Sequence, residues 1–348
     1  MNRIRQALMQ AWNGRGGWGQ VLCFALLPVS YVFGGLIAIR RWLYQAGFFK
    51  THALPVPVIV VGNVMVGGVG KTPITMALVN HLRTQGWRVG VLSRGYGRAT
   101  SGTVAVTQNN TATDVGDEPL LIARNCNVPV YVSASRVDAG RALLREHPDV
   151  EVLVCDDGLQ HWQLSRDIEL CVFDERGVGN GHLQPAGPLR EAWPRKPLSY
   201  SVPCFVVQSS GQTGPDVFPA QRHLADLAVQ ADGTQRPLSS WAHAPAQAVA
   251  GIAKPEVFFS MLQAKGITLT HAQALPDHAD MQQLQIDLTL GDVFCTEKDA
   301  VKLWAHHPHA WAVPLITTLP ADLLTAIDQH LAAAQKAKLS SPHGHQTA

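Results

Sequence analysis

The sequence predicts an α/β protein in which a mostly parallel sheet has helices on both faces, with a smaller C-terminal α/β domain and an N-terminal membrane-associated helix. Short β-branched runs alternate with helical patterns from residue 56 onward, Pro/Gly-rich chain at 177–203 interrupts the alternation, and an uncharged apolar stretch precedes it. Such alternation is typical of parallel sheets covered on both faces. With 348 residues, 46% of them hydrophobic, the chain is long and apolar enough for about two domains.

The predicted elements follow the chain in two sets. The larger domain is expected to have strands at 56–61, 88–92, 128–132, 151–155 and 168–173, and helices at 73–84, 118–125 and 135–146. The smaller domain is expected to have strands at 247–250, 268–270 and 291–295, and helices at 254–264 and 280–288. The predicted division is 1–45 for the membrane-associated segment, 46–200 for the larger domain, 201–334 for the smaller domain and 335–348 for a disordered tail.

The charge is unevenly distributed along the chain. Eleven Lys and Arg precede Asp114, the first acidic residue, whereas the remainder has 17 basic and 26 acidic residues. The basic part is expected to face anions, which could be lipid headgroups, phosphates or nucleic acid. Few Tyr and Phe are interleaved with these charges, so a single-stranded nucleic acid is the least favoured of the three, and we predict no nucleic-acid partner. Six scattered cysteines without a C-x-x-C pair argue against a zinc ribbon and a disulfide framework, and indicate a reduced, cytosolic setting.

The N-terminal segment carries no charge from residue 16 to residue 39. Residues 21–39 are long enough to span a bilayer, but Pro28 and the Gly34-Gly35 pair would weaken a straight helix. Arginines on both sides give no orientation. We favour a segment that enters the cytoplasmic leaflet and stays there, while spanning remains open and a buried helix of a soluble core is the alternative.

A glycine-rich loop joins the first predicted strand to the helix at 73–84. The run GNVMVGGVGKTP occupies 62–73, with Met65 where the strict pattern G-x-x-x-x-G-K-[ST] has glycine. Backbone N–H groups of such a loop surround phosphates, Lys71 would neutralise the β- and γ-phosphates, and the Thr72 hydroxyl would ligate Mg²⁺. The predicted nucleotide-binding residues of this P-loop are Gly67, Gly68, Val69, Gly70, Lys71 and Thr72.

Carboxylates follow two of the other predicted elements. Asp156 and Asp157 end the strand at 151–155, at the edge of the sheet where a metal-organising carboxylate is needed; an Asp-rich turn is the alternative. Asp117 begins the helix at 118–125, and its spacing alone fits both a helix cap and a base for an incoming hydroxyl.

Two arginines are candidates for contacting substrate. Arg94 lies in SRGYGR after the strand at 88–92, where it could clamp a phosphate or simply belong to a loop. Arg190 lies in the rigid turn PAGPLRE, which could be a lid or a linker.

Several motifs in order along the chain resemble the tetraacyldisaccharide 4′-kinase family of lipid A biosynthesis. They are VGNVMVGGVGKTP (61–73), SRGYGR (93–98), GDEP (116–119), DDGLQH (156–161), PAGPLRE (185–191), PDH (276–278) and TEKDAVKL (296–303). The resemblance implies a P-loop kinase core and transfer of the γ-phosphate of ATP to the 4′-hydroxyl of an acylated disaccharide 1-phosphate lipid, forming lipid IV-A. It also implies Mg²⁺ and the cytoplasmic side of the bacterial inner membrane. No obligatory protein partner is evident from the sequence.

The resemblance further implies roles for individual residues. Asp117 would be the catalytic base, supported by His278, while Lys71 contacts the transferred phosphate. Metal carboxylates would be Asp156, Asp157 and Glu118, with Asp157 also facing the nucleotide.

Two rival classes use a similar loop. A membrane-positioning ATPase switch has a lysine immediately before the paired glycines, where this chain has Val66. A membrane-attached chaperone or metal-delivery GTPase would have an N-K-x-D segment that reads guanine, and the sequence contains none. The absence of both patterns favours the kinase.

Overall fold

The computed structural model describes residues 8–13, 17–195, 202–211, 214, 216–242, 244–277, 279, 281 and 284–340. The chain forms two compact units. The first unit comprises Met1–Lys71, Val150–Ala220 and Leu319–Ala348, and the second comprises Thr72–Asp149 and Gln221–Thr318.

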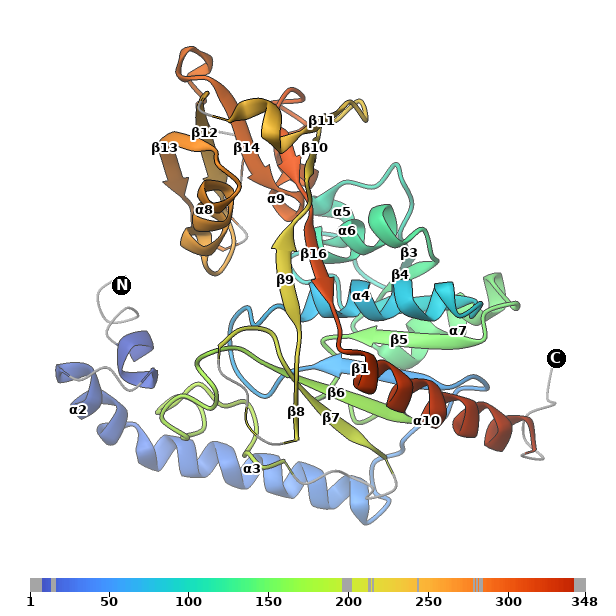
Figure 1. Ribbon diagram of the computed structural model, residues 1–348. Helices are drawn as coiled ribbons and strands as arrows, with labels where there is room; N and C mark the ends of the chain where they lie inside the picture. The colour runs from blue at the N-terminus through green and yellow to red at the C-terminus, as the bar shows by residue number, and fades with distance from the viewer. Residues whose placement is uncertain are drawn as a thin grey trace. The chain divides into compact units, whose positions relative to one another are not determined.

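The first unit is built on parallel strands in the order β5-β1-β6-β7-β8 (Figure 1). Their bounds are Val58–Gly62 (β1), Val152–Asp156 (β5), Ile168–Phe173 (β6), Cys204–Gln208 (β7) and Val217–Pro219 (β8). Every residue of β1, β5 and β6 is buried, as expected for apolar parallel strands covered on both faces. These three strands confirm the predicted ones within two residues at each end.

Helix α10 (Ala321–Leu339) packs against β6 in the same unit. Leu323, Ile327 and Leu331 recur at four-residue spacing and are buried, and the Lys338 Nζ lies 3.3 Å from an oxygen of Asp167. The predicted disordered tail at 335–348 is therefore wrong for residues 335–339, because the helix continues over them. Residues 341–348 lie outside the described residues.

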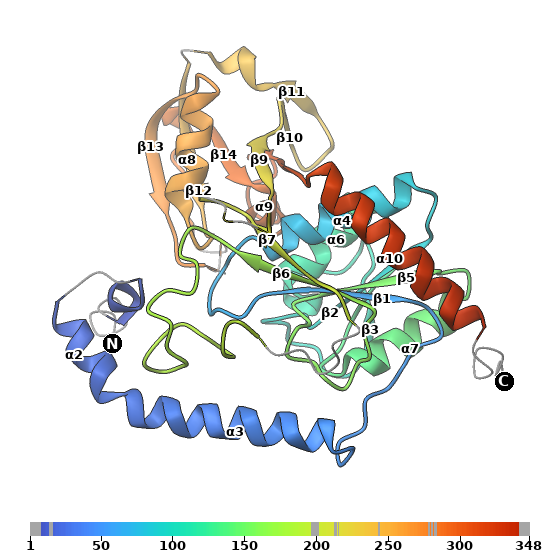
Figure 2. The same ribbon diagram turned by 60° about the horizontal axis from the view of Figure 1, so that its bottom comes forward.

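The apolar stretch of the N-terminal segment, described from residue 17 onward, forms two helices rather than the single predicted one. Trp18–Ala25 (α2) and Leu27–Gln45 (α3) meet at a bend of 48° (Figure 2). Pro28 is the second residue of α3, where its missing N–H removes no helical hydrogen bond, and the break lies at Leu26, two residues before it. Among the described residues, no single helix has the length and apolar composition of a membrane span, although the bent pair together does.

The second unit contains a small sheet in the order β3-β4-β2 with several helices. The strands are Val89–Ser93 (β2), Val104–Ala105 (β3) and Val130–Val132 (β4). The helices are Lys71–Thr84 (α4), whose first residue belongs to the first unit, Ala112–Val115 (α5), Asp117–Cys126 (α6) and Arg136–Glu146 (α7). Strands β2 and β4 are parallel, which agrees with the predicted alternation, whereas β3, which the sequence did not predict, is antiparallel to β4.

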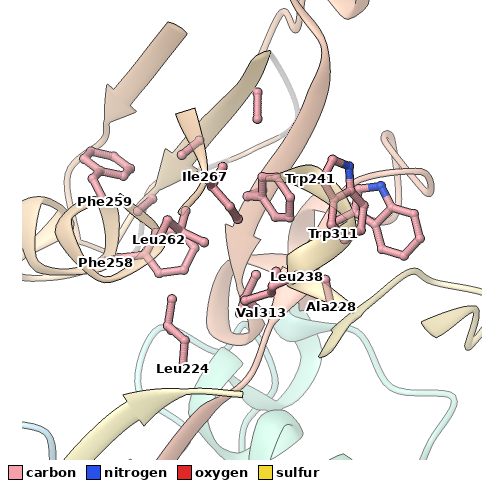
Figure 3. Packing of buried hydrophobic residues seen from close by; sticks show 14 residues of the cluster. Leu224, Ala228, Leu238, Trp241, Phe258, Phe259, Leu262, Ile267, Trp311 and Val313 are labelled. Carbon is pink, nitrogen blue, oxygen red and sulfur yellow. The ribbon is translucent and has the colours of Figure 1, made fainter. Parts of the chain in front are cut away.

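A six-stranded mixed sheet, in the order β11-β10-β15-β14-β12-β13, completes the second unit. Its strands are Leu227–Val229 (β10), Gln235–Pro237 (β11), Pro245–Ala250 (β12), Thr268–Ala274 (β13), Asp292–Thr296 (β14) and Trp311–Val313 (β15). It carries Pro255–Ala264 (α8), Glu297–Leu303 (α9) and the short helix Leu238–Trp241 (η1), while Gln221–Leu224 (β9) pairs antiparallel with Leu315–Thr318 (β16). Figure 3 shows Trp241 and Trp311 side by side in the core. Their ring centroids are 4.9 Å apart.

The helix predicted at 280–288 is wrong. Residues 284–287 have no regular structure, and only a short 3₁₀ turn (η2) follows at Leu288–Leu290. The Asp287 carboxylate accepts hydrogen bonds from the backbone N–H and the hydroxyl of Thr289, at 2.9 and 2.6 Å. Such local side-chain bonds satisfy the backbone outside a helix and so compete with helix formation. Residues 280, 282 and 283 lie outside the described residues.

Candidate active site

The glycine-rich loop runs from the end of β1 to Lys71, the first residue of α4. Gly67 and Gly70 have φ angles of 95° and 81°, which favour glycine, so the loop curls as the motif predicts. The Val66 N–H donates to the Pro188 carbonyl at 2.9 Å, and the Arg190 N–H donates to the Val64 carbonyl at 2.7 Å. The PAGPLRE turn is therefore bonded to the loop and holds its first half.

Two further side chains hold the second half of the loop. The Ser209 hydroxyl donates to the Val69 carbonyl at 2.6 Å, and the Arg176 Nη2 donates to the Gly68 carbonyl at 3.1 Å. The Nε of Arg176 also donates to both carboxylate oxygens of Asp174, at 3.0 and 2.9 Å, so the guanidinium is itself fixed. With these carbonyls engaged, the loop keeps its curled shape, and α4 follows with no acidic residue in its first turn.

A three-residue charged group lies beside the loop, and we call it the Lys71 group. Its members are Lys71, Asp157 and Arg190. The Asp157 Oδ1 lies 3.6 Å from the Lys71 Nζ and 3.3 Å from the Arg190 Nη1. Asp157 adopts a φ of 49°, a left-handed conformation that Asp tolerates better than most residues. The structure thus brings together Lys71 and Asp157, which were predicted to bind the nucleotide, and Arg190, which was predicted to contact the substrate.

Asp156 ends β5 beside Val61 of β1 and is 1% exposed. Thr72 is the second residue of α4 and is 7% exposed. Among the described residues, no group of three or more His, Cys, Asp or Glu is arranged to hold a metal ion. Mg²⁺ needs no such group, because it is usually bound by one or two carboxylates together with substrate phosphates and water. The hard oxygen donors Thr72, Asp156 and Asp157 therefore fit Mg²⁺ chemically.

A buried polar network supports the Lys71 group. The Gln160 Nε2 donates to the Asn63 carbonyl at 3.0 Å and to Glu191 at 2.8 Å. Glu191 pairs with Arg195, and Arg195 also pairs with Glu169. Gln160 of DDGLQH and Glu191 of PAGPLRE thus fix the chain around the loop, which explains part of each motif structurally.

Asp117 is positioned by two glycines of the second unit. It follows Gly116, whose φ is 95°, and a Cβ added at Gly116 would lie 3.1 Å from the Tyr96 carbonyl oxygen. Gly95 has a φ of 67°, and a Cβ there would lie 2.7 Å from the Val115 carbonyl oxygen. The SRGYGR loop and the GDE turn therefore pack backbone against backbone. Arg94 is exposed on this loop.

The environment of Asp117 is a cluster of opposite charges, which we call the Asp117 cluster. Its members are Asp117, Glu118, Asp277, Lys298 and Lys302. The Asp117 Oδ2 lies 3.2 Å from the Lys302 Nζ and 3.9 Å from the Lys298 Nζ. The Lys298 Nζ also lies 3.0 Å from Asp277 and 3.8 Å from Glu118. Burial lowers the pKa of Lys298, yet the three carboxylates outweigh burial and raise that pKa above its ordinary value.

Sequence reasoning missed three residues, two in the Asp117 cluster of the second unit and one at the glycine-rich loop of the first unit. Lys298 and Lys302 belong to the motif TEKDAVKL, which by itself assigns them no role, although their four-residue spacing on a helix indicates a shared face. Arg176 follows Asp174 by two residues after β6, and only the curl of the loop brings it to Gly68. His278, the predicted partner of Asp117, lies outside the described residues.

Known proteins resemble this chain over most of its length. The family model for tetraacyldisaccharide-1-P 4′-kinase matches residues 22–332. The tetraacyldisaccharide 4′-kinase of Acidovorax ebreus is 50% identical over 331 residues, 94% of this chain and 95% of that protein. The protein of the same name from Polaromonas naphthalenivorans is 47% identical over 349 residues, 99% of this chain and 100% of the relative.

A solved structure is similar as well. The crystal structure of LpxK from Aquifex aeolicus in complex with ATP matches with a TM-score of 0.75 and 30% sequence identity. The match covers 89% of this chain and 99% of that one.

Proposed function

Because the chain belongs to the tetraacyldisaccharide-1-P 4′-kinase family, we propose that it transfers the γ-phosphate of ATP to the 4′-hydroxyl of a tetraacyl disaccharide 1-phosphate, forming lipid IV-A. The observation that carries this proposal is the identity of 50% over 94% of the chain to a relative of that name. The curled loop with Lys71 at the start of α4 supports the nucleotide half of the reaction.

The Lys71 group is suited to hold the triphosphate. Backbone N–H groups at 67–72 would bind phosphate oxygens, and the Lys71 ammonium would move from Asp157 to the β- and γ-phosphates. Thr72, Asp156 and Asp157 would hold Mg²⁺, which would neutralise charge on those phosphates. Glu118, the fourth predicted metal ligand, belongs instead to the Asp117 cluster, where its Oε1 lies 3.8 Å from the Lys298 Nζ.

Asp117 is suited to act on the acceptor. A sugar hydroxyl is a weak nucleophile, so a carboxylate that accepts its proton as the phosphorus–oxygen bond forms accelerates the transfer. The Asp117 Oδ1 accepts the Glu118 backbone N–H at 3.2 Å, while Oδ2 faces the two lysines. We also propose that His278 supports Asp117 and that Arg94 and Arg190 contact the substrate.

The N-terminal helices are suited to a lipid surface. The apolar side chains that are more than half exposed on α2 and α3 are Trp18, Val21, Phe24, Val29, Tyr31, Val32, Leu36, Ile39 and Trp42. We propose that this face lies in the cytoplasmic leaflet of the inner membrane, where an acylated substrate is reached without extraction into water. Arg40 has a structural role, since its guanidinium stacks on Trp162 at 4.8 Å and donates to the Gln160 carbonyl at 3.2 Å.

Sedimentation with anionic vesicles tests the membrane proposal. Leu36→Glu should weaken partitioning by about tenfold or more, because it replaces an apolar side chain at the lipid surface with a charge. Leu339→Glu on α10 is the matched control, since Leu339 is also exposed, at 71%. Equal partitioning of both variants and the wild type would put the membrane contact elsewhere.

The decisive test of the reaction is transfer of labelled γ-phosphate from ATP to the detergent-dispersed tetraacyl disaccharide 1-phosphate. Labelled lipid from the wild type, dependent on Mg²⁺, is the expected result. ATP hydrolysis at full rate without acceptor, and no labelled lipid, would indicate a nucleotide switch instead.

A further inference from the structure

The motif TEKDAVKL forms a helix with two differently used faces. Thr296 caps α9 by accepting the Asp299 backbone N–H at 3.2 Å, and its hydroxyl donates to the Asp299 carboxylate at 2.7 Å. The same carboxylate accepts the Gly251 N–H at 3.0 Å, while Ala300 and Leu303 are fully buried in the core. This face therefore attaches α9 to the six-stranded sheet.

The other face of α9 packs against α6, and its contacts include an ion pair to Asp117. The Asn125 side chain near the end of α6 donates to Glu297 at 2.7 Å. Val301 packs on the cluster formed by Val115, Leu120 and Val132, and Lys298 and Lys302 reach the beginning of α6. One face thus combines an apolar contact, a hydrogen bond and two ammonium groups directed to one carboxylate.

The charges explain why Asp117 needs partners. Its side chain is 4% exposed. Glu118 and Asp277 add two carboxylates that share the Lys298 ammonium group with Asp117. A buried carboxylate is costly unless it is paired, and like charges at short range repel each other. The ammonium groups of Lys298 and Lys302 pair with the buried Asp117 carboxylate at 3.9 and 3.2 Å. Their positive charge also offsets the repulsion among the three carboxylates.

We propose that Lys298 and Lys302 are positioning residues for phosphoryl transfer, which hold the Asp117 carboxylate in the orientation that accepts the acceptor proton. The opposite face of α9 is fixed to the six-stranded sheet. The sheet therefore holds the two ammonium groups in place, and these hold the Asp117 carboxylate. This inference rests on the proposed function, because it concerns the base of that reaction.

The test measures the steady-state kinetics of the full-length chain with the lipid acceptor. Lys302→Met should lower kcat by about tenfold or more with little change in the KM for ATP, because misplacing a reacting group by about 1 Å can cost a hundredfold in rate. Lys298→Met should act in the same direction and more weakly, since its distance to Asp117 is longer. Lys302→Arg should recover most of the rate because it keeps the cation.

Two controls separate positioning from stability. Val301→Ala weakens the packing of α9 on α6 but leaves both ammonium groups, so it should lower the melting temperature by about 2–4 °C with a small effect on kcat. Lys265→Met removes a lysine whose Nζ lies 2.6 Å from the exposed Asp226, and it should leave kcat unchanged. If Val301→Ala lowered kcat as much as Lys302→Met, the lysine would be only structural and the proposal would be wrong.

A double-mutant cycle with Asp117→Asn keeps the proposal testable if Lys302→Met folds poorly. If Lys302 acts through Asp117, the lysine substitution should cost little further rate in the Asp117→Asn background. A full additional loss there, or a raised KM for ATP with unchanged kcat, would overturn the proposal in favour of direct nucleotide binding. Absence of lipid labelling by the wild type would instead refute the proposed function itself.

Discussion

The Lys71 group and the Asp117 cluster each join lysine to aspartate, but they hold the carboxylate differently. In the Lys71 group the Asp157 side chain is 34% exposed and its nearest lysine Nζ lies 3.6 Å away. In the Asp117 cluster the aspartate is 4% exposed and one of its two lysines lies 3.2 Å away. The lysines of the two groups are similarly covered, at 11% exposed for Lys71 and 23% for Lys302, so the contrast lies in the carboxylates. The partly exposed Asp157 can exchange partners at less cost than the buried Asp117, which is costly to leave unpaired. We infer that Lys71 leaves Asp157 when the nucleotide binds, whereas the Asp117 cluster keeps its carboxylate in a fixed orientation.

The largest effect is expected from Lys71→Ala. Removing the ammonium should lower kcat/KM by about 10³-fold, because a group that stabilises developing charge on the transferred phosphate contributes on that scale. Transfer of labelled phosphate to the acceptor measures it. Wild-type activity of this variant would refute the idea that the lysine leaves Asp157 for the phosphates.

The next effect is expected from Asp117→Ala. Loss of a general base should lower kcat by about 10²-fold while the KM for ATP changes little, since the aspartate acts on the acceptor. Steady-state kinetics with varied ATP separate the two constants. An equal change in both would assign Asp117 to nucleotide binding and remove the functional contrast between the two groups.

A smaller effect is expected from Gly95→Ala, which disturbs the support of Asp117. The added Cβ would lie 2.7 Å from the Val115 carbonyl oxygen in a backbone conformation with a φ of 67°, so we expect a loss of about 1–3 kcal/mol in the free energy of unfolding. Gly102→Ala is the matched control, because Gly102 has a φ of 74° but nothing within 4 Å of its added Cβ. Thermal unfolding of both variants gives the comparison. Equal destabilisation would show that the close packing of the two loops contributes nothing.

Several predictions from the sequence are confirmed. The α/β class, the family, and an ATP-dependent kinase of lipid A biosynthesis agree with the relatives and with the solved structure. Strands β1, β5 and β6 were recognisable because a buried parallel strand needs a continuous apolar run. The division into 1–45, 46–200 and 201–334 stays a prediction, as do Mg²⁺ and the individual site roles.

Two predictions were wrong, the helix at 280–288 and the disordered tail over 335–339. Both depended on local and tertiary contacts that the periodicity of the sequence does not contain. The turn at Asp287 replaced a predicted helix through bonds of one side chain to Thr289. The polar end of α10 is helical because the buried Leu323, Ile327 and Leu331 and the Lys338 contact with Asp167 attach the helix to the first unit. Propensity alone gave no reason for either outcome.

The sequence by itself determined the curled loop, the aspartates at the end of β5 and the glycines beside Asp117. In each case a residue type is required by its own backbone conformation or by the chemistry of phosphate and metal. Only the tertiary structure decided that Lys298 and Lys302 face Asp117 and that Arg176 holds Gly68. Those contacts join residues more than 100 positions apart, and their energy depends on burial and distance, which no local pattern contains.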